Sequence, residues 1–400
     1  MGNMFSQERV NTGRQLEIDL AKTVTIILMV WTHVYEFIST SFEPSLSSIN
    51  AYVTGSIICA VTFMFCMGIG LTYTRHNSAE ECFRRGIRLF TAGLALCMFR
   101  DVLPASFLYV VSKDMEQASN LVLGVECDIL HFAGLAFLLV GLLKKMNVGN
   151  VGMLLISVGL SVVGTLLEGI STGCFPVDQF LGFLWGTESN SYFPLFNWFI
   201  FVAAGQWFGD KYQFLQDKKK FHLISLLAGI VLCVVYLYVS FNFDQNVFKG
   251  LLSERFLAHR PFFDAIIVIP VNVALISLFY FIGLLIPQKA VPVFTHPSKH
   301  INQYYCISWV IICYVSYFSI RFASLSSDLE VLTASICILL ATILAVIIYT
   351  RYLQQSMDAF FGKRRVFWSV LVWIICIASF AWAMCNFDIY PTFLNGYVFG

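Results

Sequence analysis

The chain has 400 residues and a formal net charge of +1; 58% of its residues are hydrophobic and only 12% are charged. This composition excludes a soluble globular protein and indicates an all-α, polytopic integral membrane protein, and the small net charge argues against nucleic acid as a partner. The 12 cysteines lie mostly inside apolar segments and form no CxxC pair, so we expect small core residues and predict no metal site.

The first apolar segment, residues 14–37, carries a stripe of ionisable side chains. At about 100° per residue, Lys22 and His33 are separated by about three turns and lie roughly 20° apart, with Asp19 and Glu36 within about 60° of Lys22. Ionisable groups are costly in hydrocarbon, so we expect this stripe to face the protein interior or a wet cavity and to be functional. The alternative is that Lys22 and His33 reach the two interfaces, with Lys22 snorkelling.

The next two apolar segments carry further signals. In the second, residues 52–74, Gly68 and Gly70 are expected to let helices approach closely. The third, residues 89–111, is interrupted by Arg100 and Asp101. Because these two are neighbours in sequence, we expect that they cannot face each other on a helix and that each needs its own partner or water. Either a broken helix lines a cavity here, or the third helix ends at Phe99 and the pair is interfacial.

The remaining apolar segments bring the expected number of membrane-spanning helices to about eleven. They lie near residues 129–143, 151–170, 193–208, 221–241, 262–286, 301–320, 331–352 and 366–387. The fourth and sixth spans are the shortest. No linker or internal repeat divides the chain, so residues 1–400 are predicted to form a single domain.

The distribution of basic residues predicts the orientation. With a cytoplasmic N-terminus, 19 of the 25 Lys and Arg residues fall on the inner side and five on the outer side, and Arg100 lies within the membrane. This agrees with the positive-inside rule, and removing one span would reverse every later loop. We expect a bacterial-type cytoplasmic membrane.

Two groups of residues could carry acid–base chemistry. His33 is the best general-base candidate, because an imidazole titrates near neutrality and Glu36, one turn away, could orient it. His131 follows Asp128 by three residues, so the two could face each other across one helical turn. The alternative for that pair is a capped helix start with an interfacial histidine.

Three arginines, Arg84, Arg85 and Arg88, cluster at the inner mouth of the third span. Guanidinium groups suit phosphates, although anchoring by the positive-inside rule explains the same residues. The rise from Lys22 to His33 is about 16 Å along a helix, comparable with an extended pantetheine arm. This coincidence favours an acyl carrier over a generic anionic ligand.

The segment RQLEIDLAKTVTIILMVWTH resembles the first helix of the integral-membrane acyltransferases, which comprise the acyltransferase-3 family and the relatives of heparan-alpha-glucosaminide N-acetyltransferase. In the former, a basic residue, ten residues and a histidine form a motif that Lys22 and His33 fit. Further similar stretches are FMFCMGIGLTYTR, CFRRGIRLFTAG, DILHFAGLAFLLVGLL and YFPLFNWFIFVAAGQWFG, so the resemblance extends to about Tyr212. There are two departures: Ser308 stands where some members carry histidine, and the outer-loop histidine associated with the heparan enzyme is not evident, which leaves open whether His33 acts alone.

The resemblance implies transfer of an acyl group, expected to be acetyl, from cytoplasmic acyl-CoA to an acceptor on the opposite side, expected to be a carbohydrate hydroxyl or amine. Direct transfer and a transient acetyl-imidazole at His33 are equally compatible with the residues. The rival hypothesis is a secondary transporter or channel that uses the polar stripe. The expected partners are acyl-CoA, a glycan or other envelope acceptor and the lipid bilayer, with a homodimer left open. The candidate donor-binding residues are Arg14, Asp19, Lys22, Arg84, Arg85 and Arg88, and the candidate catalytic residues are His33, Glu36, Asp128 and His131.

Overall fold

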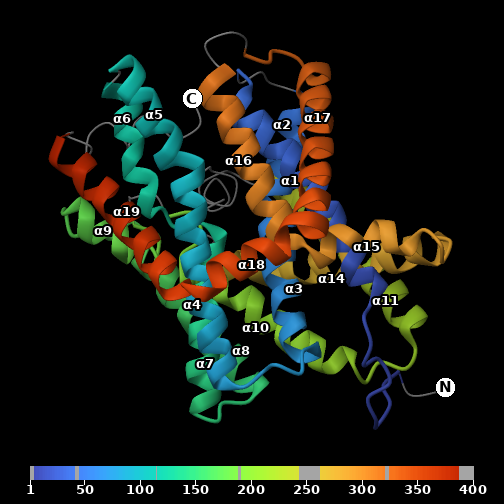
Figure 1. Cartoon of the computed structure of the whole chain (residues 1–400). Coiled ribbons are helices and arrows are strands. Elements are labelled where there is room, and N and C mark those ends of the chain that lie inside the picture. The colour runs from blue at the N-terminus through green and yellow to red at the C-terminus, as the bar shows by residue number, and fades with distance from the viewer. Residues whose placement is uncertain are drawn as a thin grey trace.

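The computed structural model describes residues 4–40, 45–113, 115–187, 191–242, 262–319 and 324–386, which form helices and no β-sheet (Figure 1). Each of the eleven expected spans coincides with a helix or with two helices joined by a short turn. The spans are α1 (Leu16–Ile38), α2 and α3 (Leu46–Val53 and Cys59–Tyr73), α4 and α5 (Ala79–Cys97 and Leu103–Ser112), α7 (Ile129–Lys145), α8 (Asn150–Leu167), α10 (Leu195–Tyr212), α11 (Lys218–Asn242), α14 (Phe262–Leu285), α16 (Ile301–Ser319), α17 (Asp328–Ile348) and α19 (Arg365–Asn386). Shorter helices are α6 (Met115–Ser119), α9 (Phe175–Leu181), α15 (Val291–Lys299) and α18 (Gln354–Lys363).

Among the described residues, six helices are long and apolar enough to cross a membrane: α1, the continuous helix Ala79–Ser112, α8, the Ala265–Leu285 part of α14, Asp328–Lys363 and α19. The all-α, polytopic membrane architecture expected from composition is therefore confirmed. The fourth and sixth expected spans correspond to α7, with 17 residues, and α10, with 18 residues, and neither is among these six.

Contacts between loops test the expected alternation of sides. Phe5, in the N-terminal segment, pairs with Leu215 in the turn between α10 and α11, and both segments are expected on the inner side. Ser39, after α1, pairs with Leu325, before α17, and both are expected on the outer side. If one span too many or too few had been predicted between the two loops of a pair, those loops would be expected on opposite faces and could not contact each other. Both pairings therefore agree with the predicted alternation.

The helices α3 and α10 pack with their backbones in contact at two glycines. A Cβ on Gly68 would lie 2.0 Å from the carbonyl oxygen of Val202, and a Cβ on Gly205 would lie 2.0 Å from that of Phe65. Only glycine permits so close an approach. The expectation for Gly68 is confirmed, but that for Gly70 is wrong, because a Cβ there would meet nothing within 4 Å.

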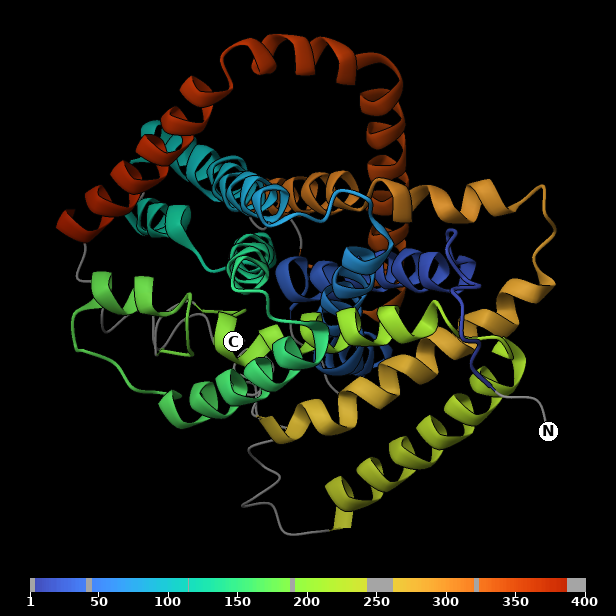
Figure 2. The ribbon, with the colours of Figure 1, turned by 90° about the horizontal axis from the view of Figure 1, so that it is seen from below.

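Helix α1 runs through the middle of the helical assembly (Figure 2), where it packs against α2, α3, α14, α15, α16 and α17. Its two exposed positions are Ile27 and Phe37, while Asp19 is 4% exposed and His33 is half-buried. The ionisable stripe therefore faces other helices rather than lipid, as predicted.

A buried polar network joins α1, α10, α11 and α14 near the predicted inner side. The Tyr212 hydroxyl donates to the Glu17 carboxylate, which also accepts from the Lys218 ammonium at 2.7 Å. The His222 imidazole lies 2.7 Å from the Tyr212 hydroxyl through Nε2 and 2.9 Å from the Ser277 hydroxyl through Nδ1. These contacts tie the N-terminal half of the chain to α14.

The third span is continuous, and the two alternatives given for its interruption are both wrong. A π-helical turn, Met98–Val102, links α4 to α5, and Pro104 occupies the first turn of α5. Proline lacks an N–H donor, and a wider turn accommodates it without ending the helix. The expectation that Arg100 and Asp101 cannot contact each other is also wrong: the Arg100 side chain bends back, so that Nε donates to Asp101 Oδ2 at 2.7 Å.

Candidate active site

His33 and Glu36 form a pair on the outer half of α1. Nδ1 of His33 lies 2.9 Å from Oε2 of Glu36, and the two side chains are 21% and 18% exposed. A carboxylate only accepts, so Nδ1 carries the proton, and neutral His33 presents an unprotonated Nε2. The pair thus has the geometry of a general base held by an acidic partner, as the sequence predicted.

Trp309, from α16, packs directly on His33. The ring centroids of the two side chains lie 4.1 Å apart, and Phe37 meets the same indole edge-on at 5.2 Å. The same indole also contacts Arg100, whose Cζ lies 4.9 Å from the indole centroid, which is cation–π distance. Trp309 therefore links the half-buried imidazole to a buried cation.

Arg100 is the centre of a buried charge cluster. Its guanidinium donates to Asp101 at 2.7 Å, to Asp128 at 2.9 Å and to Glu126, and all four side chains are less than 10% exposed. The Tyr305 hydroxyl donates to Asp128 at 2.6 Å, which brings in α16 as well. Buried ions are tolerated only when they are paired and hydrogen-bonded, so this cluster fixes the π-helical turn, the start of α7 and α16 relative to one another.

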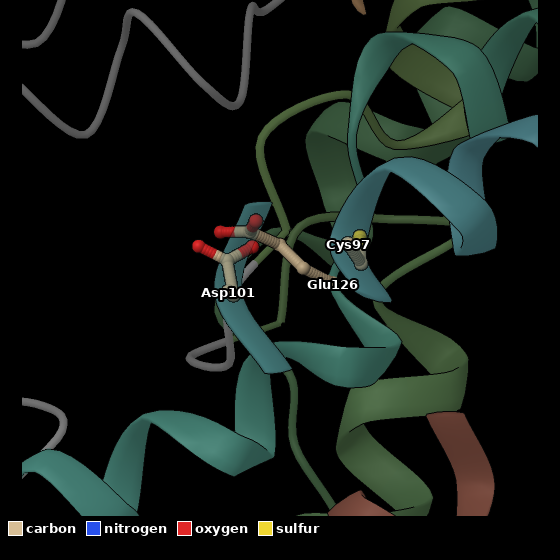
Figure 3. Close-up of side chains that lie close together, drawn as sticks. All are labelled: Cys97, Asp101 and Glu126. Atoms are coloured by element: carbon tan, nitrogen blue, oxygen red, sulfur yellow. The ribbon is translucent and has the colours of Figure 1, made fainter. Parts of the chain in front are cut away.

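Three groups that could ligate a metal, Cys97, Asp101 and Glu126, lie within 4.8 Å of one another in this cluster (Figure 3). Arg100 already donates to both carboxylates, so a metal ion would have to displace the guanidinium. Burial raises the pKa of Glu126, in the segment between α6 and α7, to about 8, so this residue holds a proton near neutral pH. We therefore assign the acidic groups to charge compensation of Arg100.

Asp128 and His131 do not pair through their side chains. Asp128 caps the start of α7 and its carboxylate serves Arg100, which agrees with the capping alternative. Nδ1 of His131 instead accepts from the Asp128 backbone N–H at 3.4 Å, and its ring is fully buried against Phe90 and Phe183. His131 is therefore neither interfacial nor directed at His33, whereas Asp128 reaches the site through Arg100.

At the inner end of the stripe, Asp19 is already engaged. Its carboxylate accepts from the Arg14 guanidinium at 2.9 Å and from the Ser298 hydroxyl at 2.6 Å. Lys22, by contrast, is half-buried and forms no hydrogen bond or ion pair with any residue in the described part of the chain. Lys22 is thus the cation of α1 that is left for an anionic or carbonyl partner.

The three clustered arginines all lie exposed on the first turns of α4. Arg85 covers the Phe137 ring at 4.4 Å and Arg84 is 3.7 Å from Glu80, while Arg88 has no hydrogen bond or ion pair to a described residue. No such contact links these arginines to the α1 stripe in the described ranges. The structure thus shows three exposed cations, while their binding of CoA phosphates and their relation to Lys22 stay predictions.

Sequence reasoning missed Trp309, Tyr305 and Glu126. Trp309 and Tyr305 belong to a stretch, INQYYCISWVII, that reads as an ordinary apolar span, and Glu126 reads as a loop residue. The one signal was that Ser308, immediately before Trp309, stands where some members of the similar acyltransferase families carry histidine.

Comparisons with known proteins bear on the first part of the chain. A family model described as "Heparan-alpha-glucosaminide N-acetyltransferase, catalytic" matches residues 14–240. The matched region runs from the start of α1 into α11 and includes His33, the three arginines of α4 and Arg100, but ends before the helix that carries Trp309. No curated protein and no solved structure matches the chain.

Proposed function

The chain belongs to the heparan-alpha-glucosaminide N-acetyltransferase catalytic family and is a transmembrane acetyltransferase; from that premise, we propose that it moves an acetyl group from cytoplasmic acetyl-CoA to an acceptor on the opposite side of the membrane. The acceptor is expected to be a carbohydrate hydroxyl or amine. The observation that supports this most is the half-buried His33–Glu36 pair on α1, with Nδ1 and Oε2 at 2.9 Å.

The pair supplies the acid–base chemistry of acyl transfer. His33 Nε2 takes the proton from the acceptor hydroxyl or amine while the acceptor atom attacks the thioester carbon. Glu36 stabilises the imidazolium that forms, and the imidazolium then returns its proton to the departing thiolate of CoA. In the two-step variant, Nε2 itself attacks the thioester carbon and the C–S bond breaks, which releases the CoA thiolate and leaves an acetyl-imidazole. The acceptor then attacks the acetyl carbon, the C–N bond breaks, and the freed imidazole takes the acceptor's proton and passes it to the thiolate.

The donor would enter from the inner side along α1. Lys22 lies about 16 Å below His33 along the helix axis, which matches an extended pantetheine arm, and its ammonium is not engaged by a described residue. The exposed guanidinium groups of Arg84, Arg85 and Arg88 suit the phosphates of the nucleotide end.

The test uses the purified full chain in detergent, with acetyl-CoA as donor and glucosamine as an acceptor probe. We expect release of free CoA thiol, and we expect His33→Ala to abolish it while acetyl-CoA binding persists. His76→Ala is the matched control, because this histidine is 85% exposed at the inner loop and pairs with Glu81. Full turnover by His33→Ala would refute the assignment.

The same preparation separates the proposal from a transporter. A transporter that used the stripe would move solute without releasing CoA thiol. We expect Arg85→Ala or Arg88→Ala to weaken acetyl-CoA binding with little change in turnover at saturating donor. Supplying radiolabelled acetyl-CoA to membranes and identifying the labelled product would reveal the natural acceptor.

A further inference from the structure

The indole N–H of Trp309 is a buried donor that has no acceptor in the described part of the chain. Trp309 is 7% exposed, and its Nε1 has no hydrogen-bond acceptor among the described residues. A buried N–H without a partner is costly, and native proteins keep few of them. The donor therefore calls for an acceptor that comes from outside the described chain.

The surroundings of this donor indicate where that acceptor sits. The indole and imidazole ring centroids lie 4.1 Å apart at an interplanar angle of 35°, so the two rings are in direct contact. The neighbouring polar groups are already engaged: the Tyr305 hydroxyl with Asp128, and the Glu36 carboxylate with His33. Any group that reacts at His33 would therefore lie beside the indole of Trp309.

Arg100 packs on the same indole. Its guanidinium carbon lies 4.9 Å from the indole centroid, within cation–π distance, while Asp101, Glu126 and Asp128 accept hydrogen bonds from its guanidinium. Arg100 is 5% exposed, so this contact is buried. The buried cluster therefore supports the indole from behind, although none of its members touches the imidazole in the described contacts.

We propose that Trp309 is a further catalytic residue, whose Nε1–H donates to the acyl oxygen of the donor thioester. When the acceptor atom bonds to the carbonyl carbon, the C=O π electrons move to this oxygen, and the indole N–H stabilises the resulting negative charge. When the C–S bond then breaks, the oxygen returns its electrons to re-form C=O, and CoA leaves as the thiolate that His33 protonates. This inference rests on the proposed function and adds the oxyanion donor that it lacks.

The test replaces Trp309 by phenylalanine, which keeps an aromatic ring but has no N–H. Removal of one such donor lowers kcat by about 100-fold, and we expect a loss of that size with acetyl-CoA affinity within about twofold of wild type. Trp31→Phe is the matched control, since the N–H of Trp31 already donates to the Ser47 hydroxyl at 3.2 Å, and it is expected to keep wild-type turnover. If Trp309→Phe does not fold, β-(3-benzothienyl)alanine at position 309 preserves the indole shape without the N–H.

A spectroscopic measurement separates donation from simple packing. The carbonyl stretch of bound [1-¹³C]acetyl-CoA should lie at lower frequency in the wild type than in the Trp309 variant, because a hydrogen bond weakens the C=O bond. Equal frequencies, or wild-type kcat in the variant, overturn the role of Trp309 and leave the proposed function standing. A wild-type protein that binds no acetyl-CoA overturns both.

Discussion

Substitution of Glu36 by glutamine tests whether the carboxylate matters through its charge. Glutamine can still accept from His33 Nδ1, so the 2.9 Å contact and the tautomer are retained while the compensation of the imidazolium is lost. A hydrogen bond to a charged group contributes about 1.5–3 kcal/mol and a neutral one about 0.5–1.5 kcal/mol. The midpoints of these two ranges differ by about 1.2 kcal/mol. The side chains are 21% and 18% exposed, so water screens the pair, and we expect the stabilisation of the transition state to fall by about 1 kcal/mol, or about fivefold in kcat.

The assay is release of free CoA thiol at saturating acetyl-CoA with glucosamine as acceptor probe. Glu36→Gln should lower kcat by about fivefold and leave the Kd for acetyl-CoA unchanged, and Glu36→Ala should lower kcat further. Asp358→Asn, at an exposed site on α18, is the control for loss of an acidic charge. Wild-type kcat in Glu36→Gln, or the same loss in the control, would refute the reasoning.

Three further predictions concern the scaffold, each read as a thermal midpoint in detergent. Arg100→Met should destabilise the fold by about 3–5 kcal/mol, since it strands buried carboxylates, and an unchanged midpoint would contradict this. Because the pKa of Glu126 is raised from 4.5 to about 8, the folded state binds the extra proton between these values, and stability should fall as pH rises through that window. Glu126→Gln should flatten this dependence, and an equal slope in both proteins would count against the assignment. Gly205→Ala should prevent correct packing, whereas Gly70→Ala should fold normally, as no neighbour lies within 4 Å of the new Cβ; equal midpoints would rule out the backbone contact.

The features that the sequence predicted are those that depend on local periodicity. The phase of Lys22 and His33 follows from helix geometry alone, and both lie on the interior-facing side of α1. The contact between His33 and Glu36 is a one-turn contact, which spacing predicts directly. The alternation of loops follows from the hydropathy pattern together with the basic residues.

The features that the sequence did not predict depend on contacts between distant segments. Arg100 receives Glu126 and Asp128 from a region more than twenty residues later, and no spacing rule connects them. The contact between Arg100 and Asp101 requires a π-helical turn, whereas the expectation assumed regular helix geometry. Trp309 contacts His33 from α16, whose sequence is typical of an ordinary apolar span. The sequence therefore did not predict that the Trp309 indole lies beside His33.

The extent of the family match has a consequence for dissecting this protein. The match ends at residue 240, yet α16 supplies the indole behind His33, and Ser277 of α14 completes the polar network that begins at Glu17. A polypeptide confined to the matched region would keep His33 but lose Trp309, which packs against its imidazole. Two separately synthesised pieces, divided between α11 and α14, would have to reassociate within the bilayer before either could contribute to turnover.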